Sequence, residues 1–191
     1  MDFNKYWDSS RDDYSDRPTI LFQDEHLFYL RDCKEILDLG CGNGNLVRKL
    51  NELGYTAHGV TYNQLEVKNR LHENVEYGDM QDLHFDNESF DGFIMWDSLE
   101  HCQSAYIALC EAKRVLREGG KGLIFMPGAN WSDCHVHICC YLPYQMEQLF
   151  KQSGLRLINV HEKNYPDGRS GQGMAIYEII KDSTYKPKFS C

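Results

Sequence analysis

The sequence has no long apolar run and no excess of basic residues. Its hydrophobic runs stay below the roughly 18 residues of a membrane-spanning helix, and the first residues, MDFNKYWDSSRDD, lack the apolar core of a signal peptide. Lys and Arg number 20 against 29 Asp and Glu, a net charge of −9. Nucleic-acid binding is disfavoured, because it usually requires a basic patch. We expect a cytoplasmic protein without a membrane span.

Repeats, low-complexity tracts and obvious linkers are also absent, which favours a single domain. Hydrophobic residues make up 42% of the 191 residues and charged residues 26%, as in ordinary globular proteins. We predict one domain over 1–182, in which 1–33 form an amino-terminal packing or lid segment, and a loose tail over 183–191. Without a secretory signal, reduced thiols are expected at all eight cysteines: Cys33, Cys41, Cys102, Cys110, Cys134, Cys139, Cys140 and Cys191.

Short strand-like runs alternate with longer helix-like runs, a pattern typical of a parallel α/β sheet. We predict strands over 35–39, 56–60, 75–77, 90–96, 122–126, 155–160 and 175–180. Helices are predicted over 20–31, between Gly44 and Gly54, and over 64–72, 104–117 and 143–152. Glycine directly after a helical run often ends the helix, so we expect Gly119-Gly120 to end the fourth helix.

A glycine-rich turn, Asp38-Leu39-Gly40-Cys41-Gly42-Asn43-Gly44, joins the first strand to the following helix. In an open parallel sheet, ligands bind beyond the carboxyl ends of the strands, and glycines let the backbone approach a ligand closely. The third glycine of the dinucleotide fingerprint is replaced by Asn45, and its acidic residue after the second strand is missing. A phosphate-binding P-loop is excluded, because no Gly-Lys-Ser/Thr follows.

The chain resembles the class I S-adenosylmethionine-dependent methyltransferases in four motifs that occur in order along most of its length. They are ILDLGCGNG (36–44), VEYGDMQDLHFDNESFD (75–91), MWDSLEH (95–101) and RVLREGGKGLIFMPG (114–128). The resemblance implies a Rossmann-like, doubly wound α/β fold with seven mostly parallel strands and the last strand antiparallel. It also implies S-adenosyl-L-methionine as cofactor and transfer of its methyl group to an oxygen or nitrogen of a small-molecule acceptor.

The same resemblance assigns cofactor contacts. It places Gly40, Cys41 and Gly42 beneath the methionine and ribose portion of the cofactor. It also places Asp38 near the methionine ammonium group, although Asp38 can equally cap the loop.

Two further segments complete this predicted cofactor site. The resemblance implies that Asp79 accepts a hydrogen bond from the adenine amino group, with Met80 beside the ring, and that Trp96 lies near the reactive methyl group. A plainer interpretation of Asp79 is that it ends a turn.

Thr61 departs from the family pattern, because most members have a carboxylate there that holds both ribose hydroxyls. A threonine hydroxyl is a weaker partner, so Asn63 or Gln64 is expected to share this duty. The departure also leaves open a second hypothesis, a non-catalytic cofactor-binding or partner subunit with the methyltransferase fold. A nicotinamide enzyme is a third, weaker interpretation.

Catalysis requires a general base only when the acceptor arrives protonated. Asp97, His101 and His137 are the candidates, with His135 beside them in the same loop as His137, and His101 can instead serve capping or packing. The thiols and imidazoles of 134–140 lie at alternate positions that can bind zinc, but their spacing matches no zinc ribbon or finger. We therefore predict no metal site.

Substrate specificity is expected to come from loops, because no insertion supplies a separate substrate domain. Tyr6, Trp7 and Tyr14 are candidates for an aromatic lid, or pack on the sheet edge. The DNA adenine motif after the fourth strand is replaced by Trp96-Asp97-Ser98-Leu99, and the Pro-Cys of cytosine carbon-5 enzymes is absent. A small-molecule acceptor is the remaining expectation, and the sequence makes no prediction of oligomeric state.

Overall fold

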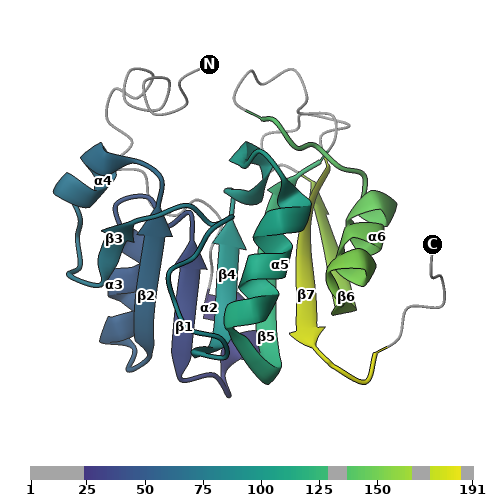
Figure 1. The fold of residues 1–191 in the computed structure, drawn as a ribbon, viewed down its shortest axis with the longest axis horizontal. Coiled ribbons are helices and arrows are strands. Elements are labelled where there is room, and N and C mark those ends of the chain that lie inside the picture. Colours follow the sequence, from purple (N-terminus) through teal and green to yellow (C-terminus); the bar gives the residue numbers. More distant parts are fainter. Residues whose placement is uncertain (1–23, 129–136, 165–172, 186–191) are drawn as a thin grey trace.

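The computed structural model describes residues 24–128, 137–164 and 173–185. Within them, seven strands form one sheet in the order β3-β2-β1-β4-β5-β7-β6 (Figure 1). Strand β7 is antiparallel to both of its neighbours, and the other pairs are parallel. The predicted fold class is therefore confirmed. The strands are β1 (Glu35–Leu39), β2 (Thr56–Thr61), β3 (Val75–Tyr77), β4 (Phe90–Trp96), β5 (Leu116–Pro127), β6 (Leu155–Asn164) and β7 (Gly173–Lys181).

Helices cover both faces of the sheet, with α5 and α6 in front of it in Figure 1 and α2 and α3 behind it. Side chains alternate along a strand, so Phe93 and Met95 of β4 join the core under α5 and α6, whereas Ile94 and Trp96 join the core under α2 and α3. The helical elements are α2 (Asp24–Leu30), α3 (Asn45–Glu52), α4 (Gln64–Lys68), the short 3-10 helix η1 (Leu99–His101), α5 (Ala105–Val115) and α6 (Pro143–Ser153).

The strand order reverses at β1, which pairs with β2 on one side and with β4 on the other. The turns after β1 and β4 meet here, because the Ser98 hydroxyl donates a hydrogen bond to the Leu39 carbonyl at 2.7 Å. Gly40 lies against this contact in the left-handed region at φ +84°, and a Cβ there would lie 2.4 Å from the Ser98 Cβ. Only glycine fits both restrictions, so the turn stays free of side chains at the switch point.

The fourth predicted helix is wrong at its carboxyl end. Helix α5 ends at Val115, and Gly119 and Gly120 lie inside β5. Leu116, the residue after the helix, has extended backbone and is fully buried, and it pairs with Phe90 before the register shifts. Burial of this leucine in the sheet outweighs continuation of the helix.

Two further predicted helices differ in detail from those in the structure. Helix α4 ends at Lys68 rather than at residue 72, since the backbone of Leu71 instead donates to the Asn43 carbonyl at 2.8 Å. Helix α3 ends at Glu52, and Leu53, which follows it before Gly54, is 54% exposed.

Several predictions fall partly or wholly outside the described residues, namely the lid aromatics Tyr6, Trp7 and Tyr14, His135, and the thiols of Cys134 and Cys191. The other six cysteines are free thiols, as expected. No helix in the described part of the chain is both long and apolar enough to cross a bilayer.

Candidate functional site

A cleft of about 820 Å³, counted to its open mouth, lies beyond the carboxyl ends of β1, β2 and β4. Its walls come from the turns after these strands, the start of α4 and η1. The lining residues are Gly40, Gly42, Val60, Thr61, Tyr62, Asn63, Glu66, Gly78, Asp79, Met80, Gln81, Asp97, Ser98, His101, Cys102 and Gln103.

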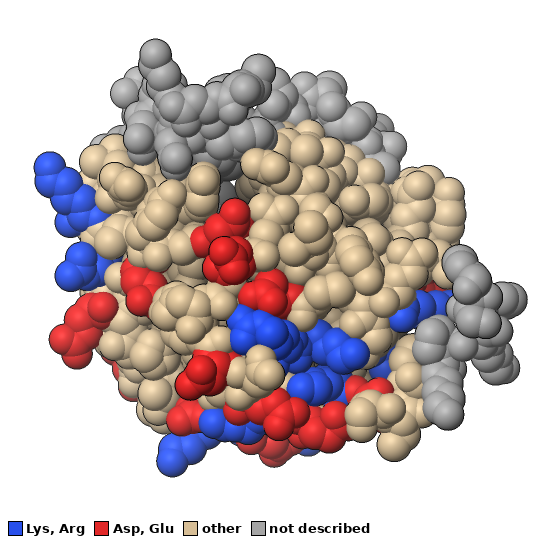
Figure 2. Space-filling view, viewed as in Figure 1, with Lys and Arg blue, Asp and Glu red and all other residues tan. Residues whose placement is uncertain are grey.

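The charged side chains that line the cleft are all acidic: Glu66, Asp79 and Asp97. No Lys or Arg occurs among the described residues that line it. On the face seen in Figure 2, basic side chains lie among acidic ones and form no continuous basic patch. Like charges repel in a partly desolvated site, so the cleft favours a cationic ligand over a phosphate-bearing one.

The floor of the cleft is bare backbone at Gly40 and Gly42. Gly42 adopts φ +55°, and a Cβ there would lie 3.6 Å from Glu66 Oε1. Cys41 between them does not line the cleft, and its thiol lies against β2, where a Cβ on Gly59 would approach its Sγ to 2.6 Å. A flat ligand can therefore lie directly on the main chain.

Asp38 lies beneath this floor and is only 3% exposed, so it does not itself line the cleft. Burial raises the pKa of its carboxyl group to about 7, because a charged carboxylate is poorly solvated there. A nearby cationic group would favour the ionised form. Asp38 is thus a carboxyl group whose charge depends on what binds above it.

Glu66 places its carboxylate beside Thr61, the position at which the family pattern has an acid. The Thr61 hydroxyl donates to Glu66 Oε2 at 2.8 Å. Asn63 caps α4 by accepting from the backbone N–H groups of Leu65 and Glu66, which fixes the first turn of the helix and its glutamate. Our sequence analysis missed Glu66, although Asn63-x-x-Glu66 matches the spacing of a helix capping box.

Asp79 both closes a turn and lines the cleft, so its two interpretations are compatible. Its Oδ1 accepts from the backbone N–H of Gln81 at 2.8 Å and from the Gln81 side chain at 3.2 Å. Gln81 in turn accepts from the Ser104 backbone N–H at 2.8 Å. Met80 lines the cleft beside Asp79, so a polar acceptor and an apolar surface are adjacent.

Trp96 lies elsewhere than expected. Its ring stacks on Phe125 with centroids 4.7 Å apart and lies 5.0 Å from the His26 ring. It is 7% exposed, belongs to the core under α2 and α3, and is not among the cleft-lining residues. The alternation of side chains along β4 explains this placement, since Trp96 points to the same face as Ile94.

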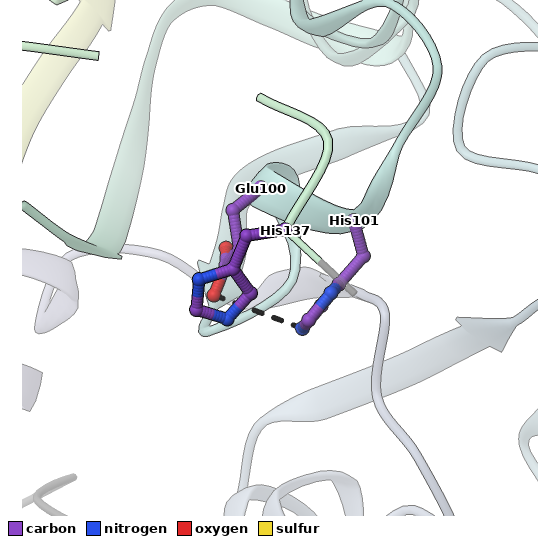
Figure 3. Close-up of side chains that lie close together, drawn as sticks. All are labelled: Glu100, His101 and His137. Atoms are coloured by element: carbon purple, nitrogen blue, oxygen red, sulfur yellow. Dashed lines mark ion pairs between the residues drawn. The ribbon is translucent and has the colours of Figure 1, made fainter. Parts of the chain in front are cut away.

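Asp97 and His101 line one end of the cleft, and His137 lies beside His101 with ring centroids 5.1 Å apart (Figure 3). Asp97 adopts φ +54°, a conformation that costs energy in a residue other than glycine and is often found at functional sites. Glu100 lies close to both histidines (Figure 3), with its Oε1 3.8 Å from His101 Nε2. Two of the predicted catalytic residues, Asp97 and His101, thus line the cleft, and the third, His137, lies beside His101.

Residues 37–124 match the family model described as a methyltransferase domain. An O-methyltransferase from Pyrenophora dematioidea is 26% identical over 147 residues, which cover 65% of this chain and 55% of that protein. The 27-O-demethylrifamycin SV methyltransferase of Amycolatopsis mediterranei (strain S699) is 29% identical over 128 residues, covering 61% and 47%. The chain therefore spans about half the length of these curated relatives.

A solved S-adenosylmethionine-dependent methyltransferase from Methanosarcina mazei has the same fold, with a TM-score of 0.70 at 17% identity. The match covers 85% of this chain and 98% of that one. Residues 37–124 thus match a methyltransferase domain, and the chain shares its fold with a solved S-adenosylmethionine-dependent methyltransferase. The fold that the four motifs imply is confirmed.

Proposed function

We propose that this protein binds S-adenosyl-L-methionine in the cleft and transfers its methyl group to an oxygen or nitrogen of a small molecule. The observation that carries the proposal is the charge of the cleft, which is lined by the carboxylates of Glu66, Asp79 and Asp97 and by no Lys or Arg among the described residues. S-adenosylmethionine has a sulfonium and an ammonium against one carboxylate, a net positive charge. A nicotinamide dinucleotide would instead place its pyrophosphate among these carboxylates.

Each wall of the cleft offers what one part of this cofactor needs. The bare backbone at Gly40 and Gly42 can lie under the nucleoside, and Glu66 can accept hydrogen bonds from the ribose hydroxyls. Asp79 offers acceptors to the adenine amino group, and Met80 offers an apolar surface to the ring. When bound, the cofactor supplies an electrophilic methyl group.

At the other end of the cleft, Asp97 and His101 are available to position an acceptor and to take its proton. Much of the acceleration of such a displacement comes from holding the nucleophile in line with the methyl carbon. An acceptor hydroxyl must also lose its proton as the carbon–oxygen bond forms and the carbon–sulfur bond breaks. A histidine suits this role, since its unperturbed pKa lies near neutrality.

A hydroxyl-bearing metabolite is the acceptor class that the comparisons support best. Both curated relatives described above are O-methyltransferases by name. The acidic cleft also disfavours a nucleic acid, whose phosphates would meet Glu66, Asp79 and Asp97. Amine acceptors remain within the proposal, because nothing about the cleft requires a base for them.

The absence of an acid at Thr61 leaves open a non-catalytic role. The position of Glu66 removes that support, because its carboxylate is hydrogen-bonded to Thr61 and lies at the same wall. The Glu66 carboxylate therefore supports the proposal for a catalytic protein.

The test is a transfer assay with methyl-labelled S-adenosylmethionine and pools of phenols, alcohols, carboxylic acids and amines. We expect label to appear in at least one hydroxyl- or amine-bearing pool and, at a limiting cofactor concentration, to be reduced in the Asp79→Ala variant. A chain that binds the cofactor but labels no pool would favour the partner-subunit hypothesis.

A further inference from the structure

We propose that Glu100, His101 and His137 bind one divalent transition-metal ion at the acceptor end of the cleft. The proposal extends the proposed function and departs from our sequence-based expectation of no metal. One potential ligand atom from each of the three side chains lies within 4.8 Å of the others. Figure 3 shows the three side chains converging on a common point from two separate segments. Two imidazoles and a carboxylate are a ligand set that Zn²⁺, Fe²⁺, Co²⁺ and Mn²⁺ accept in proteins.

The burial of Glu100 supplies the first argument. Its side chain is fully buried, whereas His101 is 16% exposed by side chain. Ionised carboxylates are costly to bury unless positive charge compensates them. A divalent ion compensates the carboxylate and uses the lone pairs of both neutral rings.

Backbone hydrogen bonds hold η1, which carries Glu100 and His101, against the segment that carries His137. The Glu100 carbonyl accepts from the N–H groups of Ile138 and Cys139 at 2.8 and 2.9 Å. The side chain of Cys139 adds a further contact, because its Sγ donates to the Cys102 carbonyl at 3.3 Å. His137 is therefore held beside η1 by main-chain contacts of the neighbouring residues. Ligands held in place before binding lose less entropy when the ion arrives.

The location suggests what the ion does. His101 belongs both to the cluster and to the cleft wall, next to Asp97. A metal with three protein ligands keeps further positions for water or substrate oxygen. Such an ion would bind a hydroxyl of the acceptor and lower its pKa as a Lewis acid. Because the lone pair of His101 then binds the metal, the carboxylate of Asp97, which also lines the cleft, would take the proton. The acceptor class implied is an alcohol or phenol rather than an amine, and the metal undergoes no change of oxidation state.

The decisive experiment measures metal binding directly, with an untagged full-length chain freed of metal by a chelator. Titration with Co²⁺, followed by calorimetry and visible absorption, is expected to show one equivalent bound through nitrogen and oxygen ligands. His137→Asn and Glu100→Gln should each weaken binding at least about tenfold. His84→Asn is the matched control, because His84 pairs with Glu76 at 3.2 Å on the surface and should bind Co²⁺ as the unmodified chain does.

Three results would overturn the proposal: no saturable Co²⁺ binding by the folded chain, thiolate-to-cobalt absorption, or unchanged affinity in His137→Asn. If Glu100→Gln does not fold, His137→Asn decides the question, since His137 is only half-buried. Calorimetry with S-adenosylmethionine on the same sample separates the two proposals. Cofactor binding without Co²⁺ binding refutes only the metal site, and Co²⁺ binding without cofactor binding refutes only the proposed function.

Discussion

Glu66→Gln is the substitution that most sharply tests how the cleft holds the cofactor. The change keeps the shape of the side chain and removes one negative charge. In the structure, Oε2 of Glu66 accepts from Thr61 at 2.8 Å, and Oε1 lies 3.6 Å from where a Cβ on Gly42 would be. The carboxylate thus lies between the floor of the cleft and the end of β2.

The expected loss follows from this geometry. In the Glu66→Gln variant, the amide oxygen of the new side chain can still accept from Thr61, so the fold and α4 should be preserved. A hydrogen bond to a charged group contributes about 1.5–3 kcal/mol. Loss of that contribution weakens S-adenosylmethionine binding by roughly ten- to a hundredfold. Thr61→Val removes only the hydroxyl that orients Glu66, and should cost about 0.5–1.5 kcal/mol.

The assay is calorimetric titration with S-adenosylmethionine and with its demethylated product, at one ionic strength. Glu52→Gln is the control, because Glu52 is an exposed acid on α3 outside the cleft and carries the same charge change. The double variant Glu66→Gln/Thr61→Val should show coupling, since the two side chains touch. Equal affinities in Glu66→Gln and Glu52→Gln would refute our account of this wall.

Three further predictions concern the floor and the adenine end of the cleft. Below pH 7, binding of the ammonium-bearing cofactor should release a proton from Asp38, whose ligand-free pKa is about 7; affinity should rise with pH up to 7 and level off above it. Asp38→Asn should abolish the proton release measured in buffers of different ionisation enthalpy, and persistence of the release would assign it elsewhere. Gly42→Val should abolish cofactor binding, because a branched residue at φ +55° is strained and fills the floor. Gly119→Ala, also at positive φ but with open space around it, should lower stability and leave affinity intact; a similar loss in both would indicate a backbone effect alone. Asp79→Ala should weaken binding by about 1–3 kcal/mol, and unchanged affinity in calorimetry would remove Asp79 from the site.

The Asp38 carboxyl also links the fold to pH. Its pKa is higher in the folded chain than in the unfolded one, so the folded state binds more protons between about pH 4 and pH 7. The free energy of unfolding from this group should therefore fall as pH rises through that window. A bound cation above Asp38 should reduce the fall. Burial of an ionisable carboxyl group at Asp38 lowers stability, and such destabilising features are common at functional sites.

Much of the fold could be predicted from the sequence where apolar runs are short and bounded by turns. The limits predicted for β1, β3 and β4 agree with the structure. The end of α5 could not be predicted, because the pattern up to Gly119-Gly120 remains compatible with a helix. The helix ends earlier because Leu116 pairs with Phe90, a contact between residues that are distant in sequence.

Only some of the residues that line the cleft could be predicted, again because local sequence and distant contacts both determine their positions. Residues directly after a strand, such as Gly40 and Asp79, reach the cleft through local geometry that the motifs encode. Glu66 lies one helical turn further on and reaches the cleft only because Asn63 caps α4. Trp96 does not line the cleft, since the motif marks the end of β4 but the face to which its last side chain points depends on the sheet.

The central claim is that an acidic, glycine-floored cleft binds a sulfonium nucleoside. Its most direct test is titration of the purified, folded chain with S-adenosylmethionine and, separately, with NAD⁺. We predict saturation at one equivalent of S-adenosylmethionine and much weaker or no binding of NAD⁺. No saturable binding of S-adenosylmethionine, or tighter binding of NAD⁺, would contradict the account.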